Sequence, residues 1–195
     1  MAIAPARSFA QTYMPTGQTV AARYATYAVL AFAGSMLIAI AGKFQIPFWP
    51  VSASLQTLAI FVIAAAFGRK LAVATLLLYL AEGAAGLPVF YQGGGLAYFA
   101  GPTTGYLVGF VIAAGLTGYA ADLGLDRNPL KLFGVNLVGS AIILALGAAW
   151  IAIVFGPDKA LAWGVGPFIA TDVIKAALAA AVVPAGWQIV NLFRR

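Results

Sequence analysis

The chain has 195 residues, of which 63% are hydrophobic and 8% are charged, and its formal net charge is +6. Typical soluble proteins carry about 25% charged residues, so an ordinary soluble domain is excluded and an integral membrane protein is indicated. Cys and His are both absent, which excludes disulfides, thiol or imidazole metal sites, and a Cys or His catalyst. We expect no metal and no cofactor.

Residues 1–23 form the first expected element. The opening twenty residues are of mixed polarity without a continuous apolar core, so they do not resemble a cleaved signal peptide. We predict a mobile or interfacial cytoplasmic arm, followed by one transmembrane domain over residues 24–195.

Six apolar segments follow in chain order, each near the ~20 residues that cross a bilayer. The second and third are separated only by a Gly-Arg-Lys turn and should form a helical hairpin. We therefore predict an all-α bundle of six transmembrane helices in contact with the lipid bilayer, at residues 24–42, 52–68, 71–87, 104–121, 131–155 and 166–190.

The distribution of basic residues predicts the orientation of this bundle. Lys and Arg concentrate on the side of the membrane that faces the cytoplasm. One set of flanks carries Arg7, Arg23, Arg69, Lys70, Arg127, Lys131, Arg194 and Arg195, whereas the other carries only Lys43 and Lys159. Both termini are therefore predicted to be cytoplasmic, and the positive charge is interpreted as topology and not as nucleic-acid binding.

Polar residues inside the predicted spans fall mainly in the outer half of the membrane. Gln56 lies near the start of the second span, Glu82 near the end of the third, and Asp172 and Lys175 near the start of the sixth. The i, i+3 spacing of Asp172 and Lys175 places them on one helix face. Asn136 is the exception and falls in the inner half.

A charged side chain at the centre of a membrane helix costs about 2.5–3.5 kcal/mol, so such residues normally face a cavity or one another. Asp172 and Lys175 could form an ion pair that only holds the bundle together. We favour a polar cavity open to the outside. Gln56 taken alone suits an interhelical hydrogen bond, and Glu82 taken alone suits either interpretation.

Two aromatic loops are predicted on the outer side, at residues 43–53 and 88–103. Prolines stiffen the first, and Gly93, Gly94 and Gly95 loosen the second. The aromatic residues could form an interfacial belt or part of a gate that closes over a ligand. A lysine, carboxylates, amides and aromatic rings together suit a small, weakly anionic, amphipathic solute. The aromatic residues are Phe44, Phe48, Trp49, Phe90, Tyr91, Tyr98 and Phe99.

Small residues predict close helix approach. Gly105 and Gly109 open the fourth span at i, i+4 spacing, which favours packing within the bundle. The pairs Ala21/Ala25 and Ala31/Ser35 on the first span could pack inside the bundle or face a partner membrane protein.

The residues also resemble a known family. P-V-x-x-x-L-Q-T at 50–57, GLPVF at 86–90, GPTTGYLVGF at 101–110 and TDVIKAALAA at 171–180 are similar to the BioY family. BioY proteins are biotin-specific substrate-binding (S) components of energy-coupling factor (ECF) vitamin transporters. The resemblance implies a prokaryotic plasma-membrane protein that takes up biotin, with both outer loops capping the site.

The resemblance also implies site residues and partners. The D-x-x-K of the family's last span corresponds to Asp172 and Lys175, and we add Glu82, Tyr98, Gln56 and Tyr91 as candidates. The implied partners are a transmembrane coupling subunit and ATPase subunits, because the chain has no G-x-x-x-x-G-K-[ST] motif for ATP hydrolysis.

The sequence leaves three other functions open. A secondary transporter could use Asp172 or Glu82 to carry a proton, although no inverted pair of broken helices is evident. An intramembrane enzyme could use the same carboxylates as acid and base, but no catalytic motif supports one. A purely structural bundle protein could rest on the ion pair alone.

Overall fold

The computed structural model describes residues 8–13, 19–47 and 50–192, and it contains a helix in each of the six predicted segments. The four longest of these helices are long and apolar enough to cross a membrane, which makes the chain a multi-pass helical membrane protein. They are α2 (Val20–Lys43), α5 (Thr104–Asp122), α6 (Pro129–Phe155) and α8 (Ile169–Leu192).

The other two predicted spans contain shorter helices. α3 (Gln56–Phe67) has 12 residues and α4 (Arg69–Ala84) has 16. At 1.5 Å per residue, α3 extends for about 18 Å, which is less than the ~30 Å hydrocarbon core of a bilayer. The predicted count of six full crossings and the predicted side of the termini therefore stay predictions.

A single glycine separates α3 from α4. Gly68 has φ +76°, a backbone conformation that L side chains rarely adopt, and a Cβ there would lie 2.3 Å from Asp122 Oδ1. The other carboxylate oxygen of Asp122 accepts a hydrogen bond from the Arg69 amide at 3.0 Å, at the first turn of α4. The predicted hairpin therefore forms, and the C-terminal end of α5 holds its turn.

Part of the predicted N-terminal arm packs on the bundle. Residues Phe9–Tyr13 form the short helix α1, and the Phe9 ring packs edge-on against Trp187 of α8 with 5.1 Å between centroids. Ser8 Oγ donates a hydrogen bond to the Phe67 carbonyl oxygen at 3.1 Å. Residues 8–13 thus cover the ends of α3 and α8. Residues 20–23 of the predicted arm belong to α2 instead, and residues 1–7 and 14–18 lie outside the described residues.

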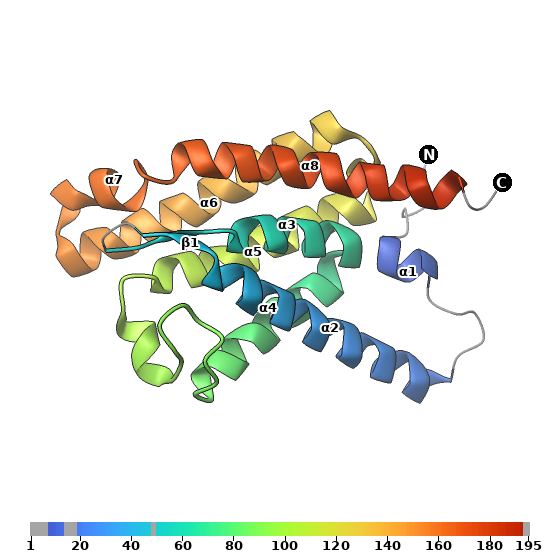
Figure 1. The fold of residues 1–195 in the computed structure, drawn as a ribbon, viewed down its shortest axis with the longest axis horizontal. Helices are drawn as coiled ribbons and strands as arrows, with labels where there is room; N and C mark the ends of the chain where they lie inside the picture. The colour runs from blue at the N-terminus through green and yellow to red at the C-terminus, as the bar shows by residue number, and fades with distance from the viewer. Residues whose placement is uncertain (1–7, 14–18, 48–49, 193–195) are drawn as a thin grey trace.

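Several short elements were not predicted from the sequence. Two two-residue strands, β1 (Gln45–Ile46) and β2 (Ala53–Ser54), pair antiparallel between α2 and α3. Two 3₁₀ helices, η1 (Leu96–Ala100) and η2 (Leu125–Arg127), flank α5, and α7 (Pro157–Gly164) precedes α8. Figure 1 shows β1, α7 and the loop before α5 toward one end of the molecule and α1 at the opposite end.

Small and polar residues set the helix packing. A Cβ at Gly105 would lie 2.2 Å from the Leu146 carbonyl oxygen, and one at Gly109 would lie 2.8 Å from Ile143 Cα. The prediction that this glycine pair packs inside the bundle is confirmed, because both close approaches are to α6. Asn136 donates to the Ala176 carbonyl oxygen at 3.3 Å, which ties α6 to α8.

The two small-residue pairs on α2 differ in burial. Ala31 and Ser35 are buried inside the protein, whereas Ala21 and Ala25 are exposed. The packing alternative therefore holds for Ala31/Ser35. The partner-facing alternative for Ala21/Ala25 stays a prediction.

Candidate ligand-binding site

A cavity of about 670 Å³ opens at the end of the bundle that carries β1, β2 and the loop before α5. This volume falls in the range of about 300–1,000 Å³ that is typical of small-molecule sites. Its walls come from the α2–α3 loop (residues 44–55), the α4–α5 loop (residues 85–103), and helices α3, α4, α5, α6 and α8.

The charged part of the lining is a pair near the start of α8. Lys175 Nζ lies 2.6 Å from Asp172 Oδ1, so the ion pair considered from the sequence forms. The two residues are only 6% and 3% exposed, and both line the cavity. Lys175 also donates to the Ser54 carbonyl oxygen at 3.0 Å, and Thr57 Oγ1 lies 3.5 Å from Asp172 Oδ1.

The Asp172–Lys175 pair can still form hydrogen bonds with a ligand. A lysine ammonium has three N–H donors, and the contacts of Lys175 with Asp172 and the Ser54 carbonyl oxygen use two of them. The pair is therefore built into the wall and can still donate to an anionic group in the cavity. A buried carboxylate beside it supplies acceptor positions for ligand N–H groups.

Amide and phenol groups form a second polar part of the lining. Gln56 Nε2 donates to the Tyr79 hydroxyl oxygen at 2.6 Å, and the Tyr79 hydroxyl donates to the Val89 carbonyl oxygen at 3.4 Å. This chain of contacts fixes Gln56 at the cavity and links α3 through α4 to the α4–α5 loop. Gln45 lines the cavity too, and its Oε1 is buried without a hydrogen-bond partner in the described part of the chain.

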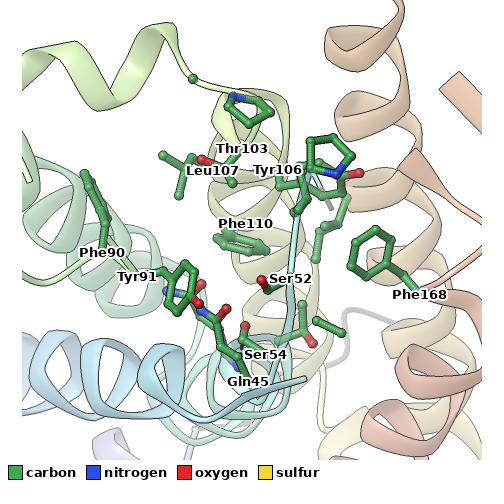
Figure 2. Close-up of a pocket in the computed structure, with 18 of the residues that line it drawn as sticks. Gln45, Ser52, Ser54, Phe90, Tyr91, Thr103, Tyr106, Leu107, Phe110 and Phe168 are labelled. Atoms are coloured by element: carbon green, nitrogen blue, oxygen red, sulfur yellow. Dashed lines mark hydrogen bonds between the residues drawn. The ribbon is translucent and has the colours of Figure 1, made fainter. Parts of the chain in front are cut away.

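Phe90 organises the aromatic wall formed by the α4–α5 loop. It is 1% exposed and stacks on Tyr98 with 4.5 Å between centroids and 29° between ring planes. Tyr79 and Phe99 pack edge-on against the same ring at 5.3 and 5.6 Å. Figure 2 shows Phe90 and Tyr91 on one side of the cavity and Phe168 on the other.

The opposite wall comes from α5 and the start of α8. The Tyr106 hydroxyl donates to the Gly164 carbonyl oxygen at 2.7 Å, and its ring lies 5.8 Å from Phe168. Phe110 of α5 also lines the cavity and lies between Phe90 and Phe168 in the view of Figure 2. A flat apolar group would therefore have aromatic faces on both sides.

Tyr98 contributes a neutral hydroxyl to this lining. Burial raises the pKa of Tyr98 above its ordinary value of 10.0, and a hydrogen bond with Thr103 offsets part of that effect. The phenol is therefore uncharged at physiological pH and acts as a hydrogen-bonding group beside the ligand space.

Five of the six candidates named from the sequence come together at the cavity: Gln56, Tyr91, Tyr98, Asp172 and Lys175. Glu82 is not among the described residues that line it. Glu82 Oε1 accepts a hydrogen bond from Ser35 Oγ of α2 at 3.1 Å, and the residue is buried between α2 and α4. A ligand contact for Glu82 stays a prediction.

Other lining residues were missed from the sequence. Tyr79, Tyr106 and Phe168 lie in apolar runs where an aromatic residue signals only helix packing, although Tyr79 stands one turn before Glu82. Thr57 directly follows Gln56 and shares its place at the start of α3. Ser54 contributes a backbone oxygen, which no side-chain pattern reveals. Phe48 and Trp49, predicted for the first aromatic loop, lie outside the described residues.

A helical membrane bundle with a cavity lined by charged, amide and aromatic groups defines a protein that binds a small amphipathic solute. The sequence model of the BioY family matches residues 13–192, and the chain belongs to the BioY family.

Named relatives agree with this assignment. A probable biotin transporter BioY from Pyrococcus horikoshii is 34% identical over 73% of this chain and 85% of its own length. The biotin transporter BioY of Thermotoga maritima is 35% identical, with 75% of this chain and 86% of the relative covered.

A solved structure is similar in fold. The crystal structure of the S-component for biotin from an ECF-type ABC transporter matches with a TM-score of 0.75 and 27% identity. The match covers 88% of this chain and 95% of that one, so nearly the whole helical bundle is shared.

Proposed function

We propose that this protein binds biotin in the cavity and mediates its uptake as the S component of an ECF transporter. The observation that carries the proposal is the Asp172–Lys175 pair, buried in the wall of an aromatic cavity of suitable volume. The relatives are named as biotin transporters and not as enzymes, which supports biotin as the ligand.

The chemistry of biotin suits each part of the lining. Its valerate carboxylate would accept a charge-assisted hydrogen bond from the Lys175 ammonium. Its ureido ring carries two N–H donors, for which Asp172 offers an acceptor. Its fused apolar ring would pack between the Phe90–Tyr98 wall and Tyr106, with Gln56 and Tyr91 at the cavity edge.

The proposal includes six membrane crossings, cytoplasmic termini and a cavity that faces outward. Its support is the basic-residue distribution together with the packing of the described ends. Arg69 and Arg127 lie at the end where α1 covers α3 and α8, because Asp122 holds the Arg69 turn and Arg127 lies 4.8 Å from the Trp187 ring. Lys43 and Lys159 lie toward the cavity end.

Partner subunits complete the proposed transporter. The chain carries no P-loop sequence, so energy for uptake would come from ATPase subunits through a membrane coupling subunit. The solved S-component of similar fold is described as part of an ECF-type ABC transporter, which favours the same assembly here.

Calorimetry on the purified protein in detergent tests the ligand. We expect saturable heat on titration with biotin in the absence of ATP, with one site per chain. Thiamine and riboflavin serve as matched controls and should give no binding heat. Binding of either vitamin without binding of biotin would refute the proposed substrate.

A further inference from the structure

Lys43 joins the two loops that border the cavity. It is the last residue of α2, directly before the α2–α3 loop. Its Nζ donates to the Phe90 carbonyl oxygen at 2.5 Å and lies 3.4 Å from the Tyr91 carbonyl oxygen. Both acceptors belong to the α4–α5 loop, 47 and 48 positions further along the chain.

The residues that Lys43 holds are central to the cavity wall. Phe90 carries the aromatic cluster with Tyr98 and Tyr79, and both Phe90 and Tyr91 line the cavity. The loop has a second anchor where the Gly95 amide donates to the Gly83 carbonyl oxygen at 2.7 Å. Lys43 therefore fixes the backbone of the loop at the position from which its aromatic side chains enter the site.

The C-terminal part of the α2–α3 loop is held by Lys175 of the cavity wall. The Leu55 amide donates to the Phe44 carbonyl oxygen at 3.1 Å, and Gln45 pairs with Ser54 across β1 and β2. The Ser54 carbonyl oxygen accepts the hydrogen bond from Lys175. A continuous set of contacts thus runs from Lys175 through the β1–β2 pair to Lys43 and on to Phe90.

We propose that Lys43 is a positioning residue that holds the α4–α5 loop in register with the described part of the α2–α3 loop (residues 44–47 and 50–55), so that the α4–α5 loop retains the bound ligand. The proposal rests on the function proposed above for the identity of that ligand. Lys43 itself does not line the cavity, so its ammonium acts on ligand escape through the loop backbone and not by direct contact.

The consequence is kinetic. Replacing the ammonium by an apolar side chain of similar length removes a charge-assisted hydrogen bond but leaves Asp172, Lys175 and the aromatic rings unchanged. The α4–α5 loop then opens more often, and bound biotin escapes faster. Because the side chain of Lys43 is exposed, water competes for this bond, and we expect roughly a tenfold faster dissociation.

Lys43→Met is the test variant, and Lys159→Met is its matched control. Lys159 belongs to α7, and its ammonium lies over the Trp163 ring at 4.8 Å, without a contact to either loop among those described. Lys43→Arg keeps the positive charge and the N–H donors and should restore most of the wild-type behaviour. Dissociation of radiolabelled biotin is measured by chase with unlabelled biotin, with thermal stability measured in parallel.

A second measurement without biotin tests whether Lys43 holds the α4–α5 loop. Chymotrypsin cleavage of the α4–α5 loop near Tyr91 and Leu96 is followed over time without biotin. We expect faster cleavage in Lys43→Met than in wild type, Lys159→Met or Lys43→Arg. This comparison does not depend on whether biotin is the substrate.

Faster dissociation and faster cleavage in Lys43→Met alone, at unchanged melting temperature, support the proposal. Equal dissociation and equal cleavage in Lys43→Met and Lys159→Met overturn it. If wild-type protein fails to bind biotin, the proposed ligand is wrong, and the cleavage comparison decides the role of Lys43 by itself.

Discussion

The Lys175 ammonium bonds the Ser54 carbonyl oxygen at 3.0 Å across 121 positions of sequence while it pairs with Asp172 on its own helix at 2.6 Å. Lys175 thereby connects α8 to the loop that borders the cavity. The ion pair is consequently part of the cavity wall and not only an internal bond within one helix. An anion bound in the cavity would compete for the Lys175 ammonium with both the Ser54 carbonyl oxygen and Asp172.

Asp172→Asn should weaken the binding of both biotin and biotin amide. Both ligands keep the ureido N–H groups, and the neutral amide is a weaker acceptor than the carboxylate. A lost charge-assisted hydrogen bond is worth about 1.5–3 kcal/mol, or roughly ten- to 150-fold in affinity. Calorimetry with each ligand measures the loss, and Asp158→Asn at an exposed position of α7 is the control. Unchanged affinity for both ligands would remove Asp172 from the site.

Gly83→Ala should disturb the aromatic wall. A Cβ at Gly83 would lie 2.1 Å from Phe90 Cζ, so the ring must leave the position in which it packs on Tyr98 and Tyr79. Overpacking of this kind typically costs about 1–3 kcal/mol, and we expect a lower melting temperature and weaker biotin binding.

Gly134→Ala is the matched control, because a Cβ there has no neighbour within 4 Å among the described atoms. It should be neutral or slightly stabilising, as alanine favours helix over glycine. Equal melting temperatures of the two variants would argue against the packing of Phe90 on α4.

The carboxyl group of Asp126 should make the stability of the protein depend on pH. Burial raises the pKa of Asp126 above its ordinary value of 3.8, although the hydrogen bond from Trp187 Nε1 and the nearby Arg127 partly offset this effect. The folded state therefore holds the proton more tightly than the unfolded chain. The contribution of Asp126 to the free energy of unfolding should be fully present below pH 3.8 and should be lost as the pH rises through the raised pKa.

Melting temperatures measured across this pH range test the assignment. Asp126→Asn keeps an acceptor for Trp187 but cannot ionise, so its melting temperature should fall less with rising pH than that of wild type. Asp158→Asn should retain the wild-type slope. An unchanged slope in Asp126→Asn would show that another group carries the pH dependence.

Membrane topology is testable because the chain contains no cysteine. Leu96 is 76% exposed in the α4–α5 loop, and Lys70 is exposed at the turn between α3 and α4. A membrane-impermeant maleimide should label Leu96→Cys in intact cells and Lys70→Cys only after permeabilisation. Labelling of Lys70→Cys in intact cells would invert the proposed orientation.

Much of the bundle was predictable because membrane helices need long apolar runs, and their ends follow charges and glycines. Gly68 marked the hairpin turn, and the Gly105/Gly109 spacing marked the contact with α6. The length of α3 was not predictable in the same way. Residues 52–55 contain no charge and no proline that would exclude a helix, but Ala53 and Ser54 form β2 and pair with β1 instead.

The site was predictable where charge was conspicuous. Asp172 and Lys175 stood out because an apolar span does not tolerate charges without a reason. Glu82 stood out for the same reason, but its partner is Ser35 on α2 and it does not line the cavity. Sequence spacing could not separate the two cases, because the face that a helix turns to a cavity depends on its neighbours. Tyr106 was hidden for the same reason, and the Ser54 carbonyl was hidden because a backbone oxygen leaves no side-chain pattern in the sequence.

The most direct test of the account compares biotin with biotin amide on Lys175→Met. Lys175 is proposed to recognise the carboxylate, which only biotin presents, so the variant should lose roughly ten- to 150-fold in affinity for biotin and far less for the amide. The elution profile and the melting temperature of the variant show whether Asp172, which has lost its ion-pair partner, destabilises the fold. Equal losses for the two ligands would contradict the assignment of Lys175 to the biotin carboxylate and the orientation of biotin in the cavity.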